Sequence, residues 1–333
     1  MGTSSRKTRN DVSVFVRDFA KYLQSGDFCD IIIENDHSEG EKTMKIRQVA
    51  KICHGQDGAI FGSLLFRFDH LGNCGVYDLQ ELEGKQDVVE MTPIARFTLD
   101  RADVLAPHSN AVTFGSEYYA DGDEFPLLYS NIYNNREKTD DPMRGVCCVY
   151  RLQRMDDGFT TTLVQLIEIG FVDDPVLWRA YPDRDGVRPY GNFVIDRDAG
   201  CYYAFVMRTE ALGTRYFTFD LPTLEEGEID PVWGVRRVVL TPEDVREAFD
   251  CEHHHFIQGA IAHEGRIYST EGFSDDETNR PAIRVIYPGA RCEEACVDLM
   301  EMGYREEPEM IDFYEGKCYY SDVHGNLYVL DFK

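Results

Sequence analysis

The feature that most constrains the fold is a pattern of strand-like segments that recurs five times along the chain. Each copy opens with polar residues, continues with a short apolar strand and a turn, and then gives an aromatic-rich strand, a second turn and a third strand. The copies begin near residues 54, 108, 190, 255 and 307. Because short apolar and aromatic runs bounded by turn residues indicate strands, the sequence predicts an all-β protein made of repeated small sheets.

One strand is missing from the last copy, and one strand is spare near the start. The fifth copy lacks a fourth strand, whereas residues 43–50 form an extra strand-like run before the first copy. Because an unpaired sheet edge is a liability, we expect this run to complete the last sheet. The predicted fold is therefore a five-bladed β-propeller closed by an N-terminal strand. Six blades remain an alternative, since the stretch from Val172 to Pro189 has room for irregular strands.

Two short helices are expected beside the strands. Residues 11–23 carry apolar side chains at helical spacing behind an Asp, which predicts a short N-terminal helix. A second helix is predicted from Thr241 to about Phe249, because Thr caps helices and Pro242 suits the first turn. The whole chain, residues 1–333, is interpreted as a single propeller domain.

The charge of the chain excludes some classes of partner. It carries 34 Lys and Arg against 60 Asp and Glu, a net charge of -26. Such a field repels phosphate backbones and anionic lipid, so neither nucleic acid nor a membrane is an expected partner. No secretory signal or apolar span is evident. The ten cysteines are expected to be reduced thiols, which predicts a cytoplasmic protein whose protein partners are unknown.

The first residues of the copies are the candidate binding site. In a propeller the first strand of each blade lines the central channel, so these openings converge. They are unusually polar for inner strands, and this favours binding of a small polar or carbohydrate ligand. A wet structural channel is the competing interpretation. The predicted ligand-binding residues are His54, Gln56, His108, Asn110, Asn192, His255, Gln258 and Glu307.

Carboxylates at the same openings raise the alternative of a glycan-active hydrolase. Asp57, Glu307 and Glu309 supply the residue type that glycosidases use, where one acid protonates the leaving oxygen and a second activates water or attacks. Asp57 and Glu309 are the candidate catalytic residues. The sequence does not give the separation of the two carboxyl groups, on which that chemistry depends.

Metal and nucleophile motifs give little support to other chemistry. His54, His108 and His255 match no local ligand spacing, and Cys292 and Cys296 lack a second cysteine pair. The acidic loops 121–124 and 274–277 fit no calcium-loop pattern. No nucleophile elbow or Cys–His pair is apparent. We therefore predict no metal site and identify no cofactor.

The blade openings resemble those of known five-bladed propellers. The run from His54 to Ala59, followed by Leu65 to Phe68, is similar to the first-blade pattern of propeller glycoside hydrolases. That resemblance implies that Asp57 is the base and Glu309 a candidate acid. The chain departs from the pattern where Asn110 and Asn192 stand in place of a third carboxylate, which puts hydrolysis in doubt.

A second resemblance points away from catalysis. The opening at Gln258, followed by the run from Gly265 to Tyr268, is similar to non-catalytic propellers of phage receptor-binding and teichoic-acid-associated proteins. The sequence thus predicts a binding module for a small polar molecule or glycan at one end of the channel. A hydrolase and a protein-interaction scaffold are its alternatives.

Overall fold

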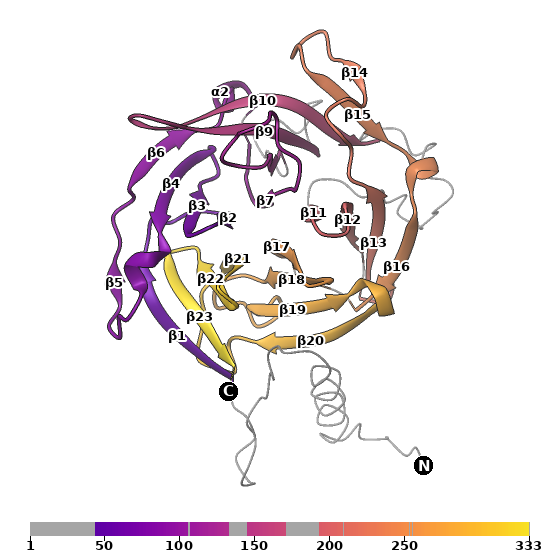
Figure 1. The fold of residues 1–333 in the computed structure, drawn as a ribbon. Helices are drawn as coiled ribbons and strands as arrows, with labels where there is room; N and C mark the ends of the chain where they lie inside the picture. Colours follow the sequence, from indigo (N-terminus) through magenta and orange to yellow (C-terminus); the bar gives the residue numbers. More distant parts are fainter. Residues whose placement is uncertain are drawn as a thin grey trace, which may run out of the picture.

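The computed structural model describes residues 44–105, 107–132, 145–170, 193–208, 210–252, 254 and 256–332. These residues form five sheets, mainly of antiparallel strands, arranged around a common centre (Figure 1). The chain is a five-bladed β-propeller. The predicted helix at residues 11–23 and the stretch considered for a sixth blade lie outside the described residues.

The strands of the first two blades lie between Gly58 and Ile169, and two later strands extend the second blade. The first blade has the order β2 (Gly58–Phe61), β3 (Leu64–Phe68), β4 (Asn73–Asp78) and β6 (Ala95–Thr98). The second has β7 (Val112–Phe114), β8 (Leu128–Asn131), β9 (Val146–Met155) and β10 (Gly158–Ile169), extended by β15 (Arg236–Leu240) and β14 (Glu228–Ile229). Short helical turns η2 (Leu79–Leu82) and α2 (Ala102–Leu105) connect strands here.

The other three blades follow in chain order. The third has β11 (Phe193–Asp196), β12 (Cys201–Met207), β13 (Thr214–Asp220) and β16 (Glu247–Cys251). The fourth has β17 (Ile257–His263), β18 (Arg266–Glu271), β19 (Ala282–Tyr287) and β20 (Cys292–Asp298), with the turn η4 (Pro288–Ala290). The fifth has β21 (Pro308–Tyr314), β22 (Lys317–Asp322), β23 (Asn326–Phe332), β1 (Met44–Lys51) and β5 (Val89–Glu90).

The fifth blade combines both ends of the described chain. Strand β1 pairs antiparallel with β23, with Ile46 opposite Leu330 and Lys51 opposite Asn326. The two-residue strand β5, which belongs to the connection within the first blade, pairs parallel with β1. The first and last parts of the ring are therefore held together by backbone hydrogen bonds as well as by packing.

The third blade corrects two predictions. By its place in the third repeat, the strand-like run from Arg236 to Leu240 is predicted to be the fourth strand, but β15 instead pairs parallel with β10 of the second blade. The fourth strand is β16, in the region predicted to be helical. Only the three-residue turn η3 (Pro242–Asp244) is helical, and Thr241 caps it as expected. Tertiary packing overrides the local signal, because Phe249 stacks on Tyr216 of β13 with ring centroids 5.3 Å apart.

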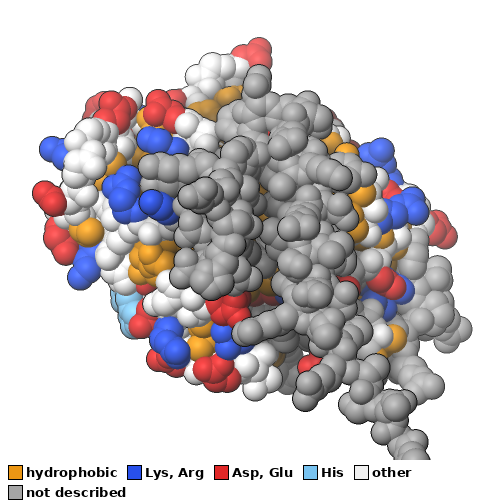
Figure 2. All heavy atoms as spheres, turned by 90° about the horizontal axis from the view of Figure 1, so that it is seen from below, with side chains coloured by type: hydrophobic (Ala, Val, Ile, Leu, Met, Phe, Trp, Pro, Cys, Tyr) orange, Lys and Arg blue, Asp and Glu red, His pale blue; other side chains and the backbone are white. Residues whose placement is uncertain are grey.

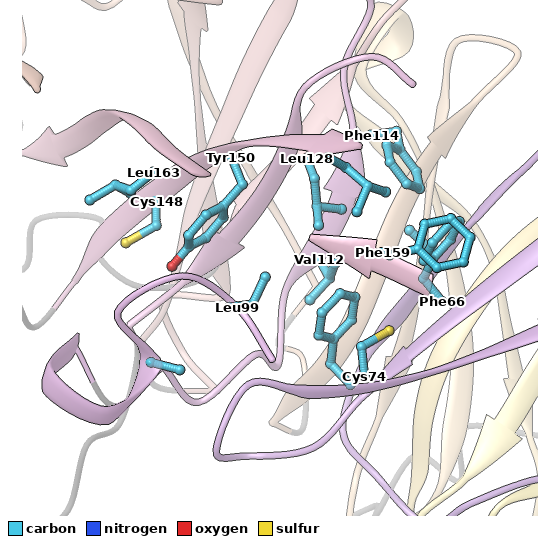
Figure 3. Packing of buried hydrophobic residues seen from close by; sticks show 14 of the residues in the cluster. Phe66, Cys74, Leu99, Val112, Phe114, Leu128, Cys148, Tyr150, Phe159 and Leu163 are labelled. Atoms are coloured by element: carbon cyan, nitrogen blue, oxygen red, sulfur yellow. The ribbon is translucent and has the colours of Figure 1, made fainter. Parts of the chain in front are cut away.

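Aromatic side chains fill the space between the first two blades. Phe66 lies edge-on to Phe114, Phe125 and Phe159, with centroids 5.4 to 5.7 Å apart. Figure 3 shows this cluster, in which Cys74 and Cys148 pack as small apolar side chains. Phe125 is 2% exposed, so it wedges the two blades together. The cysteines of the described chain are all unpaired thiols.

The surface carries mixed charge. In the side view of Figure 2, acidic and basic side chains lie next to one another over the visible described part of the rim. Many of the acidic groups are paired, as Asp123 is with Arg151 at 2.6 Å. Among the described residues, no helix has the length and apolar character that crossing a bilayer requires.

Candidate functional site

Polar side chains lie close together where three of the inner strands begin. We call this place the channel mouth and define it by Gln56, Gln258, Glu307 and Glu309. Gln56 precedes β2, Gln258 belongs to β17, and the two glutamates flank Pro308 at the start of β21. Gln56 and Glu309 are 253 positions apart in the sequence and yet in contact. Gln56 with Glu309, and Gln258 with Glu307, are therefore in contact, while their role as a binding site stays a prediction.

Glu309 is the most deeply buried acid of the channel mouth. Gln56 Nε2 donates a hydrogen bond to Glu309 Oε1 at 3.2 Å, and Glu309 is only 2% exposed. Burial, helped by the nearby acids Glu307 and Asp57, raises the pKa of Glu309 to about 8, although Arg67 opposes the shift. Oε2 has no partner among the described residues. Near neutral pH the group is thus mostly a protonated acid with hydrogen-bonding capacity to spare.

Gln258 and Glu307 form the outer part of the channel mouth. Gln258 Nε2 donates to Glu307 Oε1 and also to the carbonyl oxygen of Gly272, the latter at 3.1 Å. Burial raises the pKa of the half-buried Glu307, and the hydrogen bond from Gln258 partly offsets this. The pair presents an amide and a carboxyl group side by side, which suits recognition of hydroxyl groups.

The carbonyl of Gly272, which accepts from Gln258, directly precedes Phe273, and Phe256 lies two residues before Gln258. Phe256 and Phe273 have ring centroids 4.8 Å apart with planes at 39°. Phe256 is 49% exposed and has a φ of +57°, a left-handed conformation that a bulky residue rarely adopts. Gly272 N–H donates to the Phe256 carbonyl at 3.0 Å, which fixes the ring's segment. The position of Phe256 two residues before Gln258 was the signal that the sequence offered for its ring.

Asp57 lies behind the channel mouth. It is 1% exposed, and its Oδ2 accepts the backbone N–H of Val112 at 2.8 Å, which ties the first blade to the second. Burial raises the pKa of Asp57 well above its usual value, although the Val112 bond opposes this. Gly259 leaves space for it, since a Cβ there would lie 2.9 Å from Asp57 Oδ1. Catalysis by Asp57 and Glu309 stays a prediction.

A fully buried arginine stands near these two acids. Arg67 Nη2 donates to the carbonyl oxygens of Gly55 at 2.8 Å and Asp322 at 3.1 Å. Its Nε and Nη1 have no partner among the described residues. Burial lowers the pKa of Arg67, while Glu309 and Asp57 act against that shift. The centre of the propeller therefore holds several buried polar atoms whose bonds are incomplete.

The remaining predicted binding residues have different positions. His54 is exposed and His108 is half-buried. Asn110 is 4% exposed and accepts a hydrogen bond from Asn131 Nδ2 at 2.7 Å, so it braces the turn into the second blade. Asn192 and His255 lie outside the described residues. We do not include these five residues in the channel mouth.

The motifs considered for metals have ordinary explanations. In the loop 121–124, Glu124 pairs with Arg154 at 2.7 Å, and in the loop 274–277, Asp275 pairs with Arg305 at 3.0 Å. Arginine therefore neutralises carboxylates that a calcium ion would need. Across the ranges that the structure describes, no three His, Cys, Asp or Glu side chains group as metal ligands.

A second polar cluster was missed entirely from the sequence. It lies at the junction of the third and fourth blades and contains Cys251, His254, Glu271, Arg284 and Glu293. His254 Nε2 is 3.5 Å from Cys251 Sγ, which corrects the expectation that the chain has no Cys–His pair. The spacing of three residues between them was the only local signal, since their carboxylate partners come from other strands.

Comparisons with known proteins return the architecture without a function. No family model matches the chain, and no curated protein matches it. Among solved structures, Myxococcus xanthus glutaminyl cyclase aligns with 88% of this chain and 97% of its own at 10% identity and a TM-score of 0.46. The WD40 β-propeller domain of Doa1 covers 89% and 83% at 10% identity and a TM-score of 0.38. BamB from Moraxella catarrhalis covers 86% and 58% at 10% identity and a TM-score of 0.30.

These similarities are too remote to transfer an activity or a ligand. The propeller fold itself supports a binding or scaffold role in general terms, because it presents loops and a channel on a rigid frame. Any finer statement depends on the side chains of this chain.

Proposed function

We propose that this protein is a binding module for a small polyhydroxylated ligand, such as a sugar, at the channel mouth. The observation that carries the proposal is that the backbone of Gly272 links two aromatic rings, Phe256 and Phe273, to the hydrogen-bonded pair Gln258 and Glu307. A sugar ring has apolar C–H faces and hydroxyl edges. It therefore matches a site that offers a ring surface beside hydrogen-bonding groups.

The backbone at Phe256 supports a functional role for its ring. A left-handed conformation costs a non-glycine residue about 1–2 kcal/mol, so glycine would be the stable choice at φ of +57°. Half of the ring surface also faces solvent, where it contributes little to folding. Strained, exposed aromatic residues of this kind are typical of sites where the side chain meets a ligand.

The buried acids support binding by supplying unused hydrogen-bonding capacity. Glu309 Oε2 has no partner in the described part of the chain, and leaving a buried polar atom unbonded costs roughly 1–3 kcal/mol. Because the raised pKa keeps Glu309 largely neutral, the channel mouth accepts an uncharged ligand without a large electrostatic penalty. A ligand hydroxyl group that reaches this acid would complete its bonds.

The hydrolase alternative has less support from the same residues. A glycosidase needs one ionised carboxylate beside one protonated acid. Here burial raises the pKa of both Asp57 and Glu309, and one oxygen of Asp57 is already used by Val112. Asp57→Asn and Glu309→Gln should each abolish turnover of any glycan found to bind, if hydrolysis is the function.

We also infer the cellular compartment of the protein from its cysteines. The nine cysteines of the described chain are unpaired, which favours a reducing compartment such as the cytoplasm. The ligand is accordingly expected to be a small intracellular polyol or saccharide.

The experiment is a thermal-shift screen of the full chain against neutral mono- and disaccharides and polyols, followed by calorimetry of the hits. A ligand at 100 times its dissociation constant should stabilise the fold by roughly 2.7 kcal/mol. Phe256→Gly should weaken binding at least tenfold while leaving the fold as stable or more stable, since glycine relieves the strained backbone. Glu307→Gln should also weaken binding at least tenfold.

Tyr118→Ala is the matched control. Tyr118 is 45% exposed, like Phe256, but it follows the end of inner strand β7, whereas Phe256 precedes the start of β17. It should bind as wild type does. The proposal fails if the panel gives no shift, or if Phe256→Gly and Glu307→Gln bind every hit as tightly as the control.

A further inference from the structure

The cluster between the third and fourth blades joins three segments of the chain. Cys251 is the last residue of β16, His254 lies in the connection to β17, and Glu271 is the last residue of β18. Neither the channel-mouth residues nor the core between the blades requires a thiol, an imidazole and a carboxylate in a row. Their arrangement therefore invites a chemical explanation.

The three side chains form a relay from sulfur to carboxylate. His254 Nε2 lies 3.5 Å from Cys251 Sγ, and His254 Nδ1 lies 2.8 Å from Glu271 Oε1. The second contact is short but poorly aligned for a hydrogen bond. Because Nδ1 faces the carboxylate, a proton on that nitrogen is favoured, which leaves the Nε2 lone pair directed to the thiol. This is the order of groups in nucleophile–base–acid triads.

The carboxylate of this relay is itself firmly held. Arg284 Nε donates to Glu271 Oε1 at 2.7 Å and Nη2 to Oε2 at 3.1 Å, and Ser269 Oγ donates to Oε1 at 3.3 Å. Although burial raises the pKa of Glu271, His254 and Arg284 outweigh it and lower that pKa well below its usual range. Glu271 thus stays ionised and fixed, as a group that orients an imidazole must be.

The histidine is held from its backbone side as well. Its N–H donates to Thr214 Oγ1 at 3.1 Å, and its ring lies 5.8 Å from that of Tyr216. His254 is 1% exposed, whereas Cys251 is half-buried. Cys251 is therefore the most exposed member of the relay.

A purely structural role does not account for the imidazole. Arg284 already neutralises Glu271 with two hydrogen bonds, and it pairs with Glu293 on its other side. Arg284 alone faces two carboxylates, so a charged His254 also helps to balance them. That structural role does not explain why the other ring nitrogen, Nε2, lies against a thiol.

We propose that Cys251 is an acyl-transfer nucleophile, with His254 as its base and Glu271 as the positioning residue for His254. The chemical class of substrate is an activated acyl group, that is, an ester or a thioester. This activity is separate from sugar binding at the channel mouth, although the two sites share the connection 252–256.

The step balances without any redox partner. The Cys251 sulfur forms a bond to the carbonyl carbon while its proton moves to His254 Nε2, and the carbonyl π pair moves onto oxygen. Re-formation of the carbonyl expels the alcohol or thiol group, which takes the proton from His254 and leaves an acyl-Cys251 thioester. Water, deprotonated by His254, then attacks the thioester and restores the thiol.

The resting state of the sulfur agrees with this scheme. Burial raises the pKa of Cys251 to about 12, against the influence of Arg284. The side chain is therefore a thiol at neutral pH and depends on a base at the moment of attack, in the way a serine hydroxyl does.

The first test uses wild-type full chain and p-nitrophenyl acetate, followed by peptide mapping of acetylated cysteines. Cys292 is the internal control, because it is exposed but has no histidine partner in the described structure. The proposal predicts that Cys251 is acetylated faster than Cys292 despite its lower exposure. Acetylation of Cys292 alone, or of neither, overturns it.

The second test measures kcat and KM for p-nitrophenyl acetate in variants. Cys251→Ala should lose the acetylated intermediate, and His254→Gln should slow acylation roughly 10²-fold or more, the usual contribution of a general base. Glu271→Gln should lower kcat at unchanged KM, because it affects only the base. Cys292→Ser should behave as wild type. Circular dichroism verifies that each variant is folded, and an unchanged rate in folded His254→Gln overturns the proposal.

Discussion

Replacing Glu309 with glutamine should change how the stability of the protein depends on pH. Burial raises the pKa of this carboxyl group from 4.5 to about 8. At neutral pH the group is protonated in the folded state and ionised in the unfolded state, so unfolding releases a proton. Stability contributed at low pH is therefore lost as the pH rises from about 4.5 to about 8.

The size of the effect follows from the same shift. A pH of 7 lies about two and a half units above the pKa of this carboxyl group in the unfolded chain. That difference corresponds to roughly 3 kcal/mol of lost stability. Glu309→Gln removes the ionisation, and its amide oxygen is still able to accept the hydrogen bond that Gln56 donates at 3.2 Å. The variant should thus be more stable than wild type by up to roughly 3 kcal/mol at pH 7, and equal to it near pH 4.5.

Urea unfolding at several values between about pH 5 and about pH 8 measures this difference. Glu301→Gln is the control, because Glu301 is an exposed glutamate in the connection that leads into β21, the strand of Glu309. Its unfolding free energy should follow that of wild type at each pH. If the curves of wild type and Glu309→Gln run parallel, Glu309 does not hold a proton in the folded state, and the account of the channel mouth as a neutral site is wrong.

Two further substitutions test the packing of the propeller. Arg284→Met leaves Glu271 buried without its main partner and should cost roughly 3–5 kcal/mol in thermal unfolding, whereas Arg280→Met, which breaks a more exposed pair, should cost at most roughly 1 kcal/mol. Similar losses would contradict the described burial. Gly325→Ala should destabilise the protein far more than Gly62→Ala in the same assay. Both glycines have positive φ, but only at Gly325 would a Cβ collide with backbone carbonyl oxygens. Equal losses of stability would refute this close approach of the backbone to Gly325.

The architecture was predictable because its signal is local and repeated. Runs such as Leu64–Phe68 and Lys317–Asp322 are apolar or aromatic, short and bounded by turn residues, and each is a strand. The prediction failed where neighbours compete for a segment. Residues 236–240 have strand character, but their partner is β10 of the second blade, because β16 occupies the edge of β13. Pairing of that kind depends on tertiary packing that a local pattern does not encode.

The site was predictable only in part, for a related reason. The polar openings of Gln56, Gln258 and Glu309 follow from the repeat, so their convergence could be expected. The burial of Arg67 could not, since it depends on the carbonyl oxygen of Asp322, 255 positions away. The relay through His254 likewise depends on the register that places the end of β18 beside the connection from the previous blade. Sequence periodicity predicts the strands, whereas contacts between residues of different blades form only when the ring of blades is assembled.

Both proposed sites draw on the segment that carries the chain from the outer strand of one blade to the inner strand of the next. Within β16 and β17 the alternation of side chains is committed to packing, whereas His254 and Phe256 lie between these strands and belong to neither. The two residues differ in how firmly they are held: His254 is buried against Glu271 and Tyr216, and Phe256 is exposed. Substitution of Phe256 should therefore alter binding at little cost in stability, whereas substitution of His254, like that of Arg284, also removes a partner of Glu271. Function at Phe256 is separable from folding because the sheets on either side carry the core.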